Sequence, residues 1–462
     1  MTALALPASA LVLAMTGALV VMLAGAAGKI TAAAAAPAAL LAGAALLAQP
    51  FLGIAALTAF SHLDAVQKAL FGFLPVSAFK LIAAATIAAL LVNARDHRDR
   101  LRAALRDPVP VMAILFLALA APSFVKAGDR DLALAAIQSF LDLAILLWLV
   151  VILARTRNQV AILLWILVLT SVLSAVLVLA DFTLGVQLVA QSDAASTART
   201  VEGVTRSAGG SDYNPTTAAA LLLVGAVFAL THALESPVWR RRLLLAVGLC
   251  SAAVVLSFAR SAALAYGLVL LALLWRHRRA RRLPLIGALA LLAGLALAPF
   301  VPDEYWLRLS SIVGGAPDPT LGRRLSYNLI GADLFLRNPL FGVGPGNFFH
   351  HFTDPAYRFL PGRTLLGRDL HNMYLSVLVQ HGLIGALPFF AILALTFRNL
   401  RAVWRAPADD AIRVQALALG YAFAAYLATA LFLPSEHIKY TWILPGLAVS
   451  LRLANEKERL PP

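Results

Sequence analysis

The sequence predicts an all-α fold: a polytopic integral membrane protein with about 12–14 transmembrane helices and a large external helical loop. Composition is the first observation behind this prediction, because 61% of the 462 residues are hydrophobic and only 13% are charged. The second is that apolar runs recur along the whole chain, many of them close to the roughly 20 residues that a helix needs to cross a bilayer. We therefore expect a single polytopic membrane domain over residues 1–462.

Twelve apolar stretches have the composition of a membrane span. They lie near residues 9–27, 75–93, 109–126, 131–154, 158–180, 215–233, 243–258, 261–275, 283–300, 371–397, 411–433 and 441–453. The stretch 31–62 is also apolar but is interrupted by Pro37, Pro50 and Gly53, so we expect one kinked span or two short ones there.

Clusters of arginine between the spans predict the orientation of the chain. Four clusters lie at 95–107, at 240–242, at 276–282, and at Arg398, Arg401, Arg405 and Arg413. Alternation of loops and spans puts all four on one side, together with the C-terminus, and the positive-inside rule makes that side cytoplasmic. Segments 181–214 and 301–370 then lie outside. Because the basic residues are divided among many short loops, the net charge of +15 does not predict a nucleic-acid partner.

The longest polar segment, 301–370, is expected to cap the outer surface of the membrane domain, beside the shorter external loop 181–214. External loops of this length are usually functional when they are ordered. Residues 321–337 have helical spacing, with Leu325, Leu329, Ala332 and Phe335/Leu336 on one face. We therefore expect a small helical cap.

Two arginines stand on the side where the positive-inside rule predicts few. Arg206 precedes the span that starts near Pro215, and Arg260 lies between two spans joined by almost no loop. A guanidinium at the edge of a bilayer needs an anion. One interpretation is a structural ion pair, for example with Asp142. The other is recognition of a phosphate, which suits the planar fork of arginine.

His371 lies where the long external segment re-enters an apolar run. Polar residues are common at helix starts, which is the ordinary interpretation. The other interpretation is a general base, because a helix N-terminus disfavours imidazolium and keeps the ring neutral. Asp369 is placed to cap this helix or to orient the ring. His381, nearly three turns further along, is expected to be buried and hydrogen-bonded.

Two further motifs have an ordinary and a functional interpretation. The run GVGPGNFF (342–349) is interpreted as a backbone turn against the membrane surface, with a phosphate-binding nest as the alternative. Asp129 and Asp131 either flank a span or bind a metal ion. The sequence contains no Walker loop, no GxSxG elbow and no HExxH, and we expect neither a metal nor an organic cofactor.

Three pieces of sequence together resemble the superfamily of O-antigen ligases and O-antigen polymerases, and the ligases most. His371-Asn372-x-Tyr-Leu followed by Gly382-Leu-Ile-Gly385 resembles the hallmark of that superfamily. The segment GRRLSYNLIGADLFLRNPLFGVGPGNF (322–348) resembles the stretch ahead of its His-Asn helix, and the LSFARSAALA boundary and the Arg206 loop before Asn214 also match. The resemblance covers roughly residues 200–400.

This resemblance implies a metal-independent, inverting glycosyltransferase in the bacterial inner (cytoplasmic) membrane, with its active site facing the periplasm. The donor would be a glycan on undecaprenyl diphosphate, and the acceptor a hydroxyl of lipid A–core or of another glycan. The implied roles are deprotonation of the acceptor by His371, binding of the pyrophosphate by Arg206 and Arg260, and support from Asn372, Asp369, Arg323 and Arg324. The alternatives are a polymerase of the same superfamily and, from a different class, a transporter or flippase of lipid-linked glycans.

Overall fold

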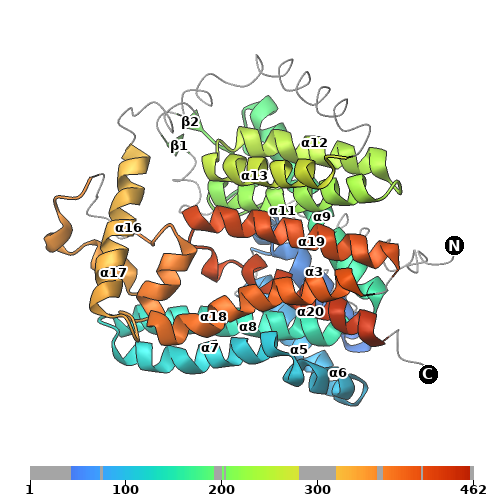
Figure 1. Ribbon diagram of the computed structural model, residues 1–462, viewed down its shortest axis with the longest axis horizontal. Helices are drawn as coiled ribbons and strands as arrows, with labels where there is room; N and C mark the ends of the chain where they lie inside the picture. The colour runs from blue at the N-terminus through green and yellow to red at the C-terminus, as the bar shows by residue number, and fades with distance from the viewer. Residues whose placement is uncertain are drawn as a thin grey trace.

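The described part of the chain is almost entirely helical (Figure 1). The computed structural model describes residues 43–72, 76–191, 200–201, 204–279, 319–361, 368–406 and 409–457. Within these residues the β structure is one antiparallel pair of two-residue strands, β1 (Thr200–Val201) and β2 (Val204–Thr205). The prediction of an all-α polytopic membrane protein is confirmed.

The helices fall into three groups along the chain. The first contains α3 (Phe51–Phe60), α4 (Asp64–Phe71), α5 (Ala78–Val92), α6 (Ala94–Arg106), α7 (Pro108–Val125), α8 (Arg130–Leu153) and α9 (Arg157–Leu184). The second contains α11 (Pro215–Glu235), α12 (Arg240–Leu256) and α13 (Arg260–Arg276). The third contains α16 (Pro319–Arg337), α17 (Phe348–Phe352), η2 (Pro355–Tyr357), α18 (Met373–Arg405), α19 (Asp410–Thr429), η3 (Ala430–Phe432), η4 (Ser435–His437) and α20 (Tyr440–Lys457).

Six of the described helices are long and apolar enough to cross a membrane, and the bent pair α5–α6 brings the number to seven if it counts as one span. The predicted spans at 243–258 and 261–275 correspond to α12 and α13, each of 17 residues. The predicted spans at 9–27 and 283–300, and the first part of 31–62, lie outside the described residues. The total of 12 to 14 therefore stays a prediction.

Local sequence explains where several of these helices begin. The Asp107 side chain accepts from Val109 N and is followed by Pro108, whose fixed φ suits the first turn. Thr156 and Gln159 form a capping box at the start of α9. Asn214 caps α11 by accepting from two backbone N–H groups, again with a proline next in the chain.

Helix α11 lies at the centre of the bundle. Its apolar window is 89% buried, and it packs on α9, α12, α13 and α19. A helix that is apolar all round is expected in such a place, because no face of it is suited to water. Beyond α19, α18 packs on α7, α19 and α20, and α20 also packs on α8.

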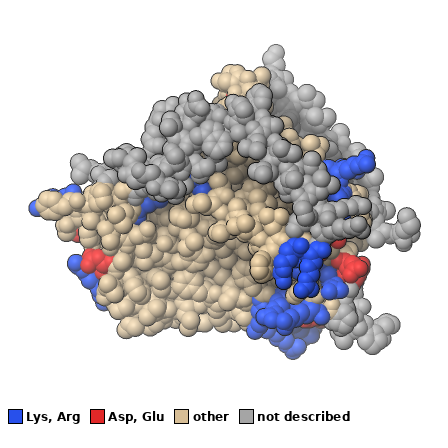
Figure 2. All heavy atoms as spheres, turned by 45° about the horizontal axis from the view of Figure 1, so that its top comes forward, with Lys and Arg blue, Asp and Glu red and all other residues tan. Residues whose placement is uncertain are grey.

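Side-chain contacts establish which helix ends lie together. Arg276 pairs with Glu235 (Nε–Oε1 2.6 Å), and its guanidinium lies 5.6 Å from the Trp404 ring centroid. These residues stand at the ends of α13, α11 and α18, so the starts of those three helices lie at the opposite end of the bundle. Figure 2 shows Lys and Arg concentrated at one end, with a broad uncharged band between them and a smaller charged group at the other end.

The arginine-rich segment 95–107, predicted as a cytoplasmic loop, is largely the helix α6, bent by 103° from α5. Its Arg100 is buried and donates to three main-chain carbonyl oxygens, those of Val151 (2.9 Å), Ala154 (2.8 Å) and Ser450 (3.2 Å). Arg100 thus pairs with carbonyls at the end of α8, which have no partner within that helix, and ties them to α20.

A cap formed by α16 and α17 covers the end of the bundle at which α18 begins, on the left of Figure 1. Helix α16 confirms the predicted helix at 321–337. The predicted apolar face is not the one that packs on the bundle, because Leu325, Leu329 and Leu336 are exposed. The helix carries two apolar stripes, and the cap is held by the other one. The buried apolar cluster comprises Tyr327, Ile330, Leu334, Val343, Phe348, Phe352, Leu370 and Val379.

The turn at 342–346 fills a break in α18. Gly382 interrupts that helix with φ 63° and ψ −174°. The turn and the broken helix exchange four backbone hydrogen bonds: Val343 N to Val379 O, Gly344 N to Gln380 O, Leu383 N to Pro339 O and Ile384 N to Leu340 O. Backbone groups freed by the break are thereby satisfied, as the interior of a membrane protein requires. The turn interpretation of GVGPGNFF is confirmed, although the turn lies in the helix break.

Candidate active site

His371 lies at the capped end of the bundle, two residues before α18. Asn372 starts that helix, because its side chain accepts from Tyr374 N (3.2 Å) and Leu375 N (3.3 Å). The predicted supporting residue Asn372 is therefore a helix cap that orients the segment carrying His371. Its contacts are with main-chain N–H groups of α18.

The His371 ring has a defined tautomer. Its Nδ1 lies 2.8 Å from the carbonyl oxygen of Asp369. A carbonyl oxygen can only accept, so Nδ1 carries the proton and the lone pair is on Nε2. A neutral imidazole with a free Nε2 is the form that removes a proton from a hydroxyl group. Of the two roles predicted for Asp369, capping the helix or orienting the ring, the second matches this contact, which is made by its main-chain oxygen.

Tyr327 of the cap fixes the plane of the same ring. The two rings stack with centroids 5.0 Å apart and planes inclined by only 12°. Tyr327 is itself buried and contacts Phe352 of α17. The cap and the start of α18 thus hold the imidazole between them. With Nδ1 bonded and one ring face stacked, Nε2 is the atom that can accept a proton.

The charges of three arginines act on His371. Burial lowers the pKa of this histidine to about 4; the hydrogen bond to Asp369 opposes the shift, and the charges of Arg324, Arg368 and Arg323 add to it. The Nε atoms of Arg323 and Arg368 are buried and have no hydrogen-bond partner among the described residues. Positive charge with unused donors beside a neutral imidazole is suited to an anionic substrate.

Two carboxyl groups are coupled to this site, Asp369, whose residue is exposed, and Glu436, which is buried. Burial raises the pKa of Asp369. Glu436 of η4 is 1% exposed, and burial raises its pKa to about 8, against a hydrogen bond from Ser376 and with a further rise from the Asp369 charge. Glu436 comes from the connection between α19 and α20, far from His371 in sequence.

Arg206 and Arg260 lie at the same end of the bundle as His371. Arg206 is buried in the loop that leads into α11, and Arg260 is the first residue of α13. Ala259 and Ala262, at the start of α13, belong to one buried apolar cluster with Val178, close to the end of α9. The charges that act most strongly on His371 come from the other group, Arg323, Arg324 and Arg368.

The suggested ion pair of Arg260 with Asp142 finds no support in the packing. Helix α13 packs on α11, α12 and α19, whereas α8, which carries Asp142, packs on α3, α6, α7, α20 and η4. The Asp142 side chain is exposed on α8.

Two other sequence interpretations are decided by local contacts. His381 is fully buried against Phe116 and Phe140, as predicted, but neither of its ring nitrogens has a hydrogen-bond partner among the described residues. Its hydrogen bond is made by the main chain, whose carbonyl oxygen accepts from Ser123 Oγ (3.4 Å), and not by the ring as expected. Asp129 caps α8 by accepting from Asp131 N and Leu132 N, both at 3.0 Å. Within the described ranges no group of three or more His, Cys, Asp or Glu is placed to hold a metal ion.

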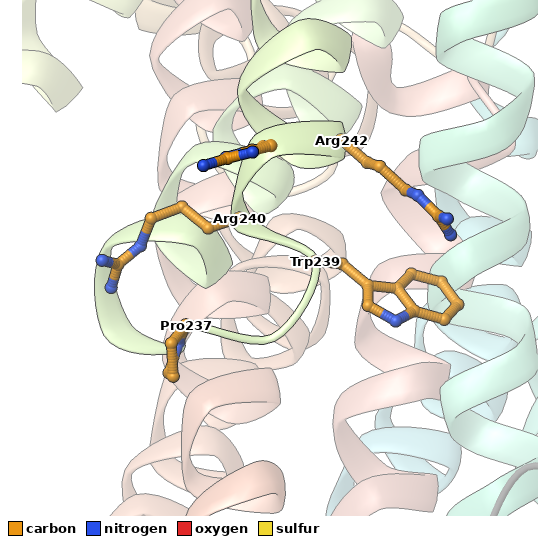
Figure 3. Close-up of a pocket in the computed structure, with 5 residues that line it drawn as sticks. Pro237, Trp239, Arg240 and Arg242 are labelled. Carbon is orange, nitrogen blue, oxygen red and sulfur yellow. The ribbon is translucent and has the colours of Figure 1, made fainter.

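A surface hollow of about 500 Å³ lies at the other end of the bundle. It is lined by Pro237, Trp239, Arg240, Arg241 and Arg242, whose side chains point in different directions (Figure 3). These residues follow the end of α11, near Glu235, and so lie far from His371. The hollow is not part of the candidate site.

Sequence reasoning missed three residues of this site. Arg368 is one of several arginines of the long external segment, and its place three residues before His371 is the signal that sets it apart. Glu436 lies in PSEHIKY (434–440), a short polar run between two apolar ones, and that contrast could have drawn attention to it. Nothing local marks Tyr327, because its stacking on His371 depends on how the cap folds.

Residues 245–390, about a third of the chain, match the family model described as O-antigen ligase. The matched stretch includes Arg260, the arginines of α16, the glycine turn, His371 and the break in α18. It begins after Arg206 and ends before Glu436. No curated protein matches the chain. The family match supports the resemblance carried by the sequence motifs.

Proposed function

We propose, from the membership of this chain in the O-antigen ligase and polymerase superfamily, that it transfers a glycan from undecaprenyl diphosphate to an acceptor hydroxyl at the periplasmic face of the inner membrane. The acceptor of the proposed ligase is lipid A–core. The observation that carries the proposal is the environment of His371, whose Nδ1 proton is held by a carbonyl oxygen and whose surroundings are cationic.

In the proposed reaction the acceptor hydroxyl gives its proton to Nε2 of His371. The acceptor oxygen then attacks the anomeric carbon of the donor, and the bond from that carbon to the lipid diphosphate breaks on the opposite face. The configuration is inverted because attack and departure take place on opposite sides. A positioned general base of this kind typically contributes about 10²- to 10⁴-fold to the rate.

The leaving diphosphate gains negative charge in the transition state, and arginines placed in advance stabilise it. We assign Arg206 and Arg260 to the diphosphate on the basis of the family resemblance. Arg323, Arg324 and Arg368 lie nearer to the base. A bound anion offsets their charges, which raises the pKa of His371, so the base is stronger with donor bound than without it.

The proposal is tested with purified protein, a lipid-diphosphate glycan and an acceptor. His371→Ala should abolish transfer, while His350→Ala, which removes an exposed histidine of the cap, should leave transfer intact. Undiminished transfer by His371→Ala would remove this residue from the mechanism. Transfer should persist in EDTA, because arginines supply the positive charge; complete inhibition by EDTA would contradict a metal-independent reaction.

Arg260→Lys tests the assignment of the diphosphate site. The substitution keeps the charge but loses the bidentate fork, so the KM for the donor should rise. Normal donor binding by the variant would make Arg260 a structural residue.

A polymerase of the same superfamily would use the same donor and the same base with a lipid-linked repeat as acceptor. A deletion strain separates the two reactions. Accumulation of long lipid-linked chains, with none on lipopolysaccharide, is expected for the ligase. Single repeats attached to lipopolysaccharide would instead identify a polymerase.

A further inference from the structure

A chain of hydrogen bonds connects the glycine turn to a buried acid behind His371. Gly346 N donates to Gln380 Oε1, Gln380 Nε2 donates to Ser376 Oγ (2.6 Å), and Ser376 Oγ donates to Glu436 Oε1 (2.5 Å). Ser376 and Gln380 occupy one face of the first part of α18, between the segment that carries His371 and the break at Gly382. The chain therefore joins both ends of this short helical piece to η4.

Glu436 is held tightly at the end of that chain. Its main-chain oxygen accepts from Trp442 Nε1 (3.0 Å), and its neighbour His437 stacks on Phe140 of α8 with centroids 4.2 Å apart. The second carboxyl oxygen, Oε2, is buried and has no partner among the described residues. A carboxyl group fixed in this way can hold α18 in place from the side of α8 and α20.

The groups around Glu436 favour the protonated acid. The charge of Asp369, in the segment before α18, acts on Glu436. The charge of Glu436 acts on the hydroxyl of Tyr426 in α19. Lys439, the nearest cation along the chain, lies over the Phe79 ring at 4.3 Å. An ionised carboxylate with one donor and a second carboxyl nearby would be poorly compensated, so the proton belongs on Oε2.

We propose that Glu436 is a positioning residue for glycan transfer, which acts as the uncharged acid by fixing Ser376 and, through Gln380 and the glycine turn, the helical piece that begins at His371. The proposal rests on the proposed function. Glu436 touches neither substrate; it determines where His371 stands relative to the acceptor hydroxyl. A small displacement of a catalytic group is enough to slow a reaction greatly.

The test compares Glu436→Gln with Glu436→Ala in the purified full-length protein. The amide keeps the shape and an oxygen for Ser376, so transfer at pH 7 should stay within about twofold of wild type. The alanine variant leaves the Ser376 hydroxyl without its acceptor, and kcat should fall by about 10- to 100-fold with the donor KM unchanged. Glu456→Gln, at an exposed position in α20, is the matched control.

A pH profile gives a readout that a purely structural role would not move. Burial raises the pKa of Glu436 to about 8, so wild-type kcat should decline above that pH as the acid ionises, whereas Glu436→Gln should retain its activity there. The glutamine profile keeps the test decisive even when Glu436→Ala fails to fold. Glu436→Ser would not serve, because a new hydroxyl could join the same chain.

Three results would overturn the inference: a glutamine variant as impaired as the alanine variant, full activity of Glu436→Ala, or superimposable pH profiles for wild type and Glu436→Gln. In a further arm, Ser376→Ala combined with Glu436→Ala should lose no more activity than the worse single variant, because both remove one chain. Failure of the proposed function is separate, since wild-type protein would then transfer no glycan.

Discussion

Gly382→Ala should destabilise the protein severely, because Gly382 lies at the break in α18, where the backbone of the preceding turn packs against the backbone of this helix. Its φ of 63° and ψ of −174° belong to a region that is essentially restricted to glycine, and the strain there is about 1–3 kcal/mol. A Cβ at this position would also lie 2.3 Å from both the carbonyl carbon and oxygen of Leu340. Backbone atoms cannot rotate away, so the turn must be displaced.

Displacement of the turn would break the two hydrogen bonds from Leu383 N to Pro339 O (2.8 Å) and from Ile384 N to Leu340 O (3.1 Å). At about 1 kcal/mol for each bond, and with the backbone strain added, the free energy of unfolding should fall by about 3–5 kcal/mol. Gly267→Ala is the matched control. It lies within α13 with no atom inside 4 Å of the added Cβ, and it should stabilise the helix by up to about 1 kcal/mol.

Cys250, the single cysteine of the chain, provides the assay. It is buried in α12 and becomes accessible to a thiol-reactive dye when the protein unfolds in detergent. The Gly382→Ala variant should react at a clearly lower temperature or denaturant concentration than wild type. If its midpoint equals that of wild type or of Gly267→Ala, the helix break does not require glycine and this reasoning is wrong.

Three further predictions follow from the site and from α6. The acid limb of kcat/KM should lie near pH 4 and not near the ordinary 6.5, because the pKa of His371 is lowered and the ring stays neutral until the pH falls that far; a limb near 6.5 would contradict its burial. Arg368→Gln removes a positive charge, so the limb should move to higher pH, and an unmoved limb would place Arg368 away from the base. Arg100→Ala removes three hydrogen bonds and leaves the carbonyl oxygens of Val151 and Ala154 without their partner, so it should cost about 2–3 kcal/mol or more, against about 0.5 kcal/mol or less for the exposed Arg102→Ala, measured by the same thiol assay.

The sequence predicts the helices of this protein well, because apolar runs and capping residues are local signals. Helix α16 was predicted to within two residues, yet its buried face was not, since two apolar stripes run along it. The sequence does not indicate which of the two stripes packs against the bundle. Tyr327 is on the buried stripe, where Gly331 lets α16 approach closely: a Cβ there would lie 2.6 Å from Leu370 Cδ1.

Part of the candidate site can be predicted from the sequence, because it depends on local signals. His371 and Asn372 begin a helix, and helix starts are visible in sequence. Arg206 and Arg260 were predicted to share the side of the membrane with His371, and the helix directions agree with that placement. Glu436 and Arg368 depend on contacts between segments brought together by folding, which hydrophobic pattern and spacing do not contain. Their roles, like those of the predicted residues, stay predictions until tested.

The short helical piece ahead of Gly382 belongs to two cores at once. Met373 and Val377 pack into the main core of the bundle, whereas Leu370 and Val379 pack into the apolar cluster of the cap. His371 therefore sits on the seam between two separately packed bodies. A displacement of the cap relative to the bundle would move this piece, and the histidine with it. The position of the proposed base therefore depends on the packing of both cores.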